Sequence, residues 1–78
     1  MLQKKPTLII TFATTTQAMA MEKFCTQHAL PGRLIPVPRE ITAGCGLSWK
    51  ARPEEQEQLI AALIGAEMQW EACHILEI

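Results

Sequence analysis

The spacing of hydrophobic positions changes several times along the chain, and each spacing predicts one element. The β-branched apolar run Leu-Ile-Ile-Thr-Phe at residues 8–12 predicts a buried central strand. Between residues 16 and 29, apolar residues recur three or four apart, as on a helix with one buried stripe. That stripe consists of Ala18, Met21, Cys25 and Ala29. Threonines at 14–16 offer N-caps, and Leu-Pro-Gly at 30–32 ends the helix because proline cannot continue it.

Two further strands are predicted in the middle of the chain. Residues 33–37 read as the second strand, and Pro36 indicates a sheet edge because proline has no N–H to donate to a neighbouring strand. Residues 38–44 form a connecting loop. Apolar and polar residues then alternate over 47–51, which predicts a third strand with one face in solvent.

A second helix and a last strand complete the pattern. Residues 53–55 (Pro-Glu-Glu) are a strong helix start, since proline suits the first turn and acids favour the positive end of the helix dipole. The buried stripe of this helix is Leu59, Ile60, Leu63 and Ile64, and the helix ends near residue 65 or 66. Alternation over residues 70–78 predicts the fourth strand.

The predicted order is β-α-β-β-α-β within a single domain, residues 1–78. This order is that of the ferredoxin-like α+β fold, with two helices on one face of a four-stranded antiparallel sheet. In this fold the second strand lies at an edge, where Pro36 is tolerated. A chain this short buries only about 60% of its unfolded surface, so exposed edge strands make a homodimer a reasonable expectation.

Charge and composition exclude some classes of function. The net charge is −1, and the chain has two Phe, two Trp and no Tyr, so little attracts or stacks on nucleic acid. No apolar run approaches the roughly 20 residues of a membrane span. Three widely spaced cysteines do not suit a secreted disulfide scaffold, and we expect a reducing, cytoplasmic location.

Cys45 is the residue whose surroundings are most like a chemical site. Its neighbours Gly44 and Gly46 remove steric cover, permit positive φ and allow successive N–H groups to form a small anion-binding nest. The nearby cations Arg39, Lys50 and Arg52 would favour a thiolate, which is the reactive form of cysteine. The alternative is a glycine-rich turn in which the cysteine is merely small enough to be tolerated.

The remaining polar residues offer weaker candidates. Cys25 lies on the apolar stripe of the first helix and is expected to be a buried, inert thiol. Cys73 lies in the last strand, where it faces either core or solvent. His28 and His74 form no metal motif with the cysteines, and no cofactor or metal is expected. The acids at 54, 55 and 57 suit a solvated helix start better than a catalytic pair.

The sequence around Cys45 resembles the selenium/sulfur carrier protein-like family of small bacterial domains. The resemblance extends from about Thr7 to His74, and its most specific part is Pro-Arg-Glu-Ile at 38–41 followed by Gly-Cys-Gly-Leu at 44–47. It implies that the cysteine at position 45 holds a sulfur or selenium atom as a persulfide or selenide and passes it to an acceptor protein. A cysteine or selenocysteine lyase would be the donor, and the protein would be a carrier rather than a stand-alone enzyme.

Two other functions stay open. The first is a protein-interaction or regulatory module with the ferredoxin-like fold, in which Cys45 is a structural turn residue. The second is a thiol redox sensor in which Cys45 and Cys73 form a reversible disulfide, with Cα atoms within about 7 Å.

Overall fold

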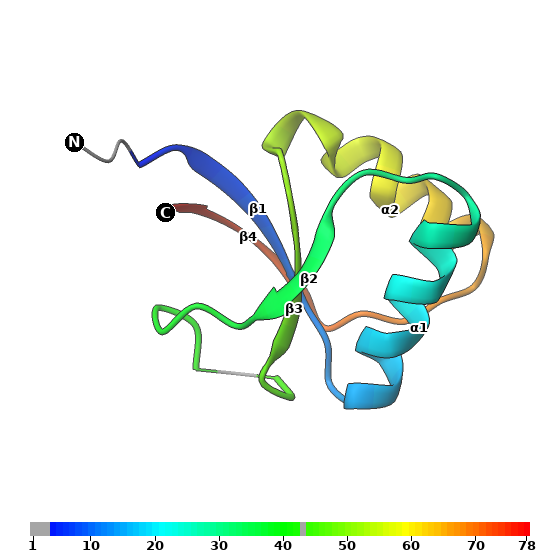
Figure 1. Cartoon of the computed structure of the whole chain (residues 1–78), viewed down its shortest axis with the longest axis horizontal. Coiled ribbons are helices and arrows are strands. Elements are labelled where there is room, and N and C mark those ends of the chain that lie inside the picture. Colours follow the sequence, from blue (N-terminus) through cyan, green and yellow to red (C-terminus); the bar gives the residue numbers. More distant parts are fainter. Residues whose placement is uncertain (1–3, 43) are drawn as a thin grey trace.

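The protein is described here by a computed structural model that covers residues 4–42 and 44–78. Figure 1 shows two helices on one side of a four-stranded sheet. The strands are β1 (Pro6–Thr11), β2 (Arg33–Pro36), β3 (Leu47–Ala51) and β4 (Ala72–Glu77). The helices are α1 (Thr15–Gln27) and α2 (Gln56–Gly65), and a short 3-10 turn, η1 (Pro53–Glu55), leads into α2.

The sheet has the strand order β2-β3-β1-β4, and each neighbouring pair is antiparallel. This topology confirms the ferredoxin-like α+β fold. It also places β2 at an edge, as Pro36 predicts, since an edge strand can lack one donor. Thr14 caps α1, with its hydroxyl accepting a hydrogen bond from the Gln17 N–H at 3.1 Å.

The main core lies between the sheet and the two helices. The buried positions of the predicted helix stripes, among them Met21, Leu59 and Leu63, pack here against the side chains of β1 and β3. Leu8 and Ile10 on β1, and Phe12 just after it, are two positions apart, so their side chains lie on the same face of the sheet. This face of the central strand supplies the middle of the core. Burial of this kind contributes about 25 cal/mol for each Å² of apolar surface removed from water.

The third strand differs from its prediction. Ser48 is fully buried and Trp49 and Ala51 nearly so, whereas the alternating sequence predicts a half-solvated strand. The reason is topological, because β3 lies between β1 and β2. The first part of the connection, residues 37–42, also lies on the helix-free side of the sheet (Figure 1), and its Ile41 is buried.

Buried hydroxyls on this second face are satisfied by main-chain acceptors. The Thr11 hydroxyl donates to the Ala72 carbonyl at 3.3 Å, and the Ser48 hydroxyl donates to the Ile35 carbonyl at 3.5 Å. A buried hydroxyl without a partner would cost about 1–3 kcal/mol, so these bonds make polar residues acceptable inside the sheet. Polar identity alone therefore does not indicate a solvent-facing position in this chain.

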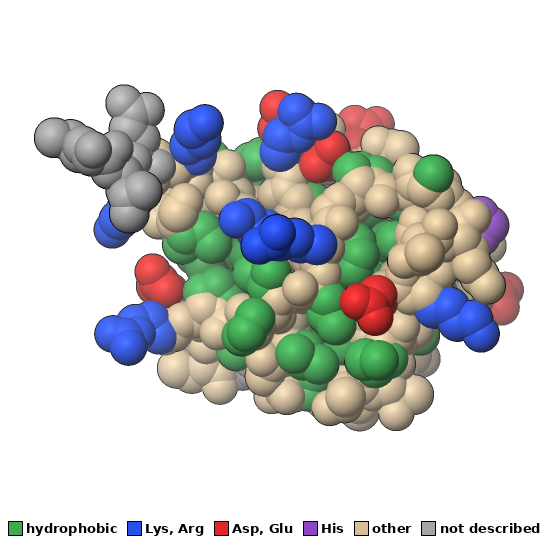
Figure 2. All heavy atoms as spheres, in the orientation of Figure 1, with side chains coloured by type: hydrophobic (Ala, Val, Ile, Leu, Met, Phe, Trp, Pro, Cys, Tyr) green, Lys and Arg blue, Asp and Glu red, His purple; other side chains and the backbone are tan. Residues whose placement is uncertain are grey.

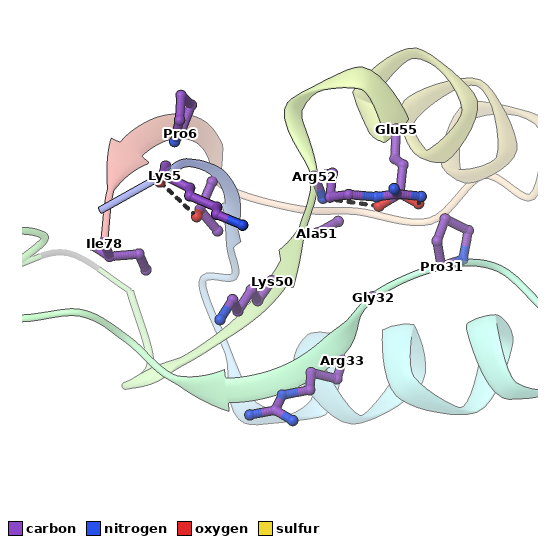
Figure 3. A pocket seen from close by; sticks show the side chains of 11 residues that line it. Lys5, Pro6, Pro31, Gly32, Arg33, Lys50, Ala51, Arg52, Glu55 and Ile78 are labelled. Atoms are coloured by element: carbon purple, nitrogen blue, oxygen red, sulfur yellow. Dashed lines mark hydrogen bonds and ion pairs between the residues drawn. The ribbon is translucent and has the colours of Figure 1, made fainter. Parts of the chain in front are cut away.

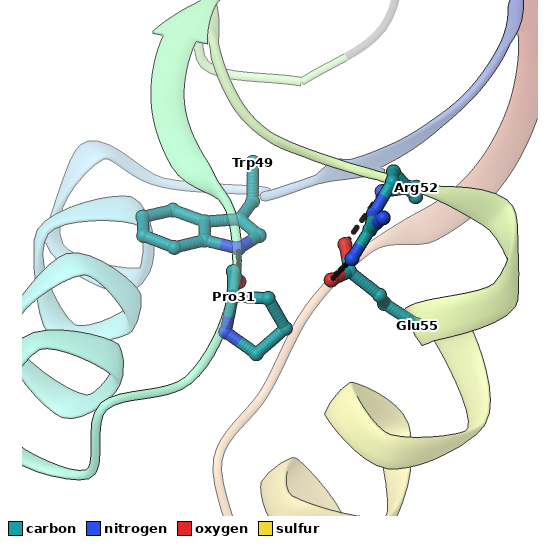
Figure 4. A network of polar contacts seen from close by, with 4 residues as sticks. All are labelled: Pro31, Trp49, Arg52 and Glu55. Atoms are coloured by element: carbon teal, nitrogen blue, oxygen red, sulfur yellow. Dashed lines mark hydrogen bonds and ion pairs between the residues drawn. The ribbon is translucent and has the colours of Figure 1, made fainter.

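The turn between α1 and β2 is fixed by the Trp49 side chain. Its indole N–H donates to the Pro31 carbonyl at 3.0 Å, as Figure 4 shows. The next residue, Gly32, has a φ of +109°. A Cβ at Gly32 would lie 2.2 Å from the indole nitrogen and 2.6 Å from the Lys50 carbonyl oxygen. Only glycine fits this turn without moving β3.

Replacing Gly32 by alanine is expected to destabilise the protein by about 2 kcal/mol or more, because positive φ and the overlap with Trp49 both oppose a Cβ. Gly65→Ala is the matched control: nothing lies within 4 Å of its Cβ position, and Gly65 belongs to α2. Alanine there should stabilise by about 0.5–1 kcal/mol. Urea unfolding of both variants measures the difference, and equal effects would contradict this account of the turn.

Candidate functional site

Cys45 lies in the connection between β2 and β3, just before β3 begins. Its flanking residues Gly44 and Gly46 both have a φ of +92°, as the sequence pattern predicts. The Cys45 N–H donates to the Phe12 carbonyl at 3.0 Å, and the Val37 N–H donates to the Gly46 carbonyl at 3.0 Å. The cysteine is therefore held by main-chain bonds to the end of β1 and to the residue after β2.

These bonds give the two glycines different roles. A Cβ at Gly44 would lie 2.9 Å from the Phe12 carbonyl oxygen, whereas nothing lies within 4 Å of the corresponding position at Gly46. Gly44 thus permits a close approach of two main-chain segments. At Gly46 there is room for a side chain, and glycine is favoured there only by the positive φ. Because the Cys45 N–H is already bonded, it is not available for the anion-binding nest that the sequence suggests.

The Cys45 side chain is partly buried rather than fully exposed. It packs against the hydrophobic core on the helix side of the sheet, and its Sγ lies 3.9 Å from the Leu47 carbonyl oxygen. Sulfur is a weak hydrogen-bond donor, so this contact orients the thiol more than it stabilises it. A reagent or partner would meet only part of the sulfur surface.

The structure does not gather the predicted cations around Cys45. Lys50 is paired with Arg33 and Ile9, and Arg52 follows β3, so both lie toward the far end of that strand. The expectation that they surround the thiol is therefore wrong. Arg39 is exposed on the connection, and no hydrogen bond or ion pair among the described residues joins it to Cys45. Its role at the site stays a prediction.

The charged group beside the loop is instead a carboxylate. Glu71 Oε1 would lie 3.3 Å from a Cβ at Gly44, and the Glu71 N–H donates to the Thr11 carbonyl at 2.7 Å. Sequence reasoning missed Glu71 because it lies 26 positions after Cys45, and only the pairing of β1 with β4 brings it here. No local motif signals that contact.

The other two thiols lie in more apolar surroundings. Cys25 is buried on α1, as predicted, and burial raises its thiol pKa to about 11. Cys73 is paired with Ile10 across β1 and β4 and packs against the core. Burial raises the pKa of Cys73 as well, although a hydrogen bond with the Trp70 side chain partly opposes the effect. Both thiols are therefore protonated at neutral pH, and all three cysteines are free.

Within residues 4–42 and 44–78, no group of three or more His, Cys, Asp or Glu side chains is arranged to hold a metal ion. The same stretch of chain contains no helix with the length and hydropathy needed to cross a bilayer.

The raised pKa of Cys25 predicts a loss of stability at alkaline pH. Between pH 9 and 11 the unfolded chain releases the Cys25 proton, whereas the folded chain retains it, so unfolding becomes more favourable as pH rises. The full effect is roughly 3 kcal/mol, begins near pH 9 and is complete above pH 11. Urea titrations at several pH values should show a shallower alkaline decline in Cys25→Ala than in the wild type. Parallel declines would assign the effect to other groups.

A family model described as Putative Se/S carrier protein-like matches residues 7–75. The searches of curated proteins and of solved structures gave no match.

Proposed function

Because this chain belongs to the Se/S carrier protein-like family, we propose that it carries a sulfur or selenium atom on Cys45 and transfers it to a partner protein. The observation that supports this most directly is the position of Cys45 between two positive-φ glycines. Neither neighbour has a side chain to cover the sulfur, and the residue lies in a loop at one end of a rigid sheet.

Comparison of the three thiols supports the same choice. A carrier cysteine must be reached by two partners in turn and must react as a thiolate. Cys25 is 2% exposed, and burial holds the pKa of both Cys25 and Cys73 above the ordinary range. Cys45 is the thiol that lies outside the helices and strands.

The proposed chemistry needs no acid–base residue on this chain. The Cys45 thiolate attacks the terminal sulfur of a donor persulfide, the donor S–S bond breaks, and the donor cysteine leaves as a thiolate. Cys45 then bears the persulfide. An acceptor nucleophile attacks its outer sulfur, and the Cys45 thiolate is released. For selenium, the same two displacements occur at a selenium atom.

Two partners follow from this chemistry. The donor is a protein that holds the atom on its own cysteine as a persulfide, or as the corresponding S–Se species, and a cysteine or selenocysteine lyase is the proposed class. The acceptor is a second protein or enzyme with a nucleophile that takes the atom. Each has to approach the part of the molecule where the β2–β3 connection meets the ends of β1 and β4.

A second candidate function is a protein-interaction module in which Cys45 is structural. The observation that favours it is the bond from the Cys45 N–H to Phe12, which ties the loop to the sheet whatever side chain stands at 45. In this case Cys45→Ser would keep every interaction of the protein. In the carrier, serine at that position would abolish transfer while leaving the loop intact.

The experiment is to reduce the protein, remove the reductant, and then incubate it anaerobically with a cysteine lyase and cysteine, or with a selenocysteine lyase and selenocysteine. Intact-mass measurement of the wild type should show an addition of one sulfur, about 32 Da, or one selenium, about 79 Da. Cys45→Ser should show none. Cys73→Ser is the matched control, because Cys73 is also partly buried and free, and it should load as the wild type does.

Loading at Cys73 instead of Cys45, or no loading of the wild type by either donor, would contradict the carrier proposal. Circular dichroism of each variant checks that the fold is retained.

A further inference from the structure

A second feature lies at the opposite end of the sheet from Cys45. Residues at the start of β1 and β2, at the end of β3 and at η1 line a cleft of about 620 Å³, drawn in Figure 3. Four of its lining residues are cations: Lys5, Arg33, Lys50 and Arg52. Figure 2 shows Lys and Arg side chains around a hollow on the side of the molecule where β1 begins and β4 ends.

Two of these cations are direct neighbours across the sheet. Arg33 on edge strand β2 is the register partner of Lys50 on β3, so both side chains project from the same face. Like charges directly opposite one another destabilise an antiparallel pair. The pairing therefore costs folding free energy that an anion bound between the two side chains would recover.

Among the side chains that line the cleft, Glu55 is the one acid. Its carboxylate accepts hydrogen bonds from the Arg52 side chain at 3.0 Å and from the Arg52 N–H at 2.8 Å. These bonds lower the pKa of Glu55 and keep it ionised beside Arg52. No ion pair to Lys5, Arg33 or Lys50 exists among residues 4–42 and 44–78, and residues 1–3 and 43 contain no acid.

We propose that this cleft binds an oxyanion of the phosphate class, free or as part of a phosphorylated small molecule. Arg33 would engage the oxyanion through its planar fork, and Lys50 and Lys5 would add point charges from neighbouring segments. A volume of about 620 Å³ is typical of small-molecule sites. A concave site of this size favours a compact ligand over the flat contact of an acidic protein surface.

The anion site is separate from the carrier chemistry. Cys45 lies before β3 begins at Leu47, and Lys50 lies three positions further along that strand, which corresponds to about 10 Å. An anion bound beside Lys50 does not touch the Cys45 sulfur. The cleft therefore adds a second ligand to the protein, and its test is independent of persulfide loading.

The experiment is a titration of the whole chain with pyrophosphate and with adenosine diphosphate at constant ionic strength, followed by amide chemical shifts. Saturable shifts are expected at residues 5, 7, 32, 33 and 50–52, which all have an amide N–H. Equal affinities would mean that the site recognises the phosphate groups alone. Tighter binding of the nucleotide would mean that the remaining cleft contacts the rest of a phosphorylated metabolite.

Charge reversal at position 33 separates binding from folding. Arg33→Glu places an acid opposite Lys50, so the ligand-free variant should melt about 2–5 °C higher than the wild type. Its dissociation constant for pyrophosphate should rise at least about tenfold. Lys50→Gln should weaken binding in the same direction. Lys23→Gln, an exposed cation on α1, is the matched control and should bind as the wild type does.

Three results would overturn the proposal. The first is the absence of saturable shifts with both ligands. The second is an equal loss of affinity in Lys23→Gln and Arg33→Glu, which indicates attraction by overall charge only. The third is saturable binding of a glutamate-rich peptide at these residues without any binding of pyrophosphate, which would assign the cleft to an acidic protein partner.

Discussion

The structure depends on the complete burial of β1. Leu8, Ile9 and Ile10 are fully buried, and the strand is paired with β3 on one side and β4 on the other. A strand buried on both faces needs every main-chain group bonded and apolar side chains in both directions. The short run at 8–12 meets both requirements. The main-chain bond of Cys45 is made to the carbonyl at the end of this strand, and the cationic cleft begins at the other end.

The types and the order of the elements can be predicted from the sequence because the signals for each element lie within the element or beside it. Threonine caps, the Leu-Pro-Gly stop and helical spacing require only neighbouring residues, and Pro36 carries information about its place in the sheet. Solvent exposure of β3 was mispredicted because the burial of Ser48 is a tertiary effect. It depends on flanking strands and on a hydrogen bond to Ile35, neither of which appears in the alternation of residues 47–51.

At the candidate site, too, local features could be predicted from the sequence and tertiary contacts could not. The glycines beside Cys45 and their positive φ angles are readable from sequence, since few other residues adopt that conformation. The electrostatics were not readable. Lys50 is close to Cys45 in sequence but is carried away along an extended strand, whereas Glu71 is brought close by the pairing of β4 with β1. Sequence distance predicts spatial distance poorly wherever a strand begins, and Cys45 lies two residues before one.

If Cys45 is the carrier thiol that we propose, the half-buried setting of its sulfur also limits the order in which partners bind. Main-chain bonds hold the loop at Phe12 and Val37, and one side of the thiol rests on the core, so only part of the sulfur surface is left for a partner. A donor and an acceptor that need the same sulfur face cannot be bound together. Delivery through Cys45 would therefore proceed by alternation, with the donor leaving before the acceptor arrives, and each partner would compete with the other for one docking position.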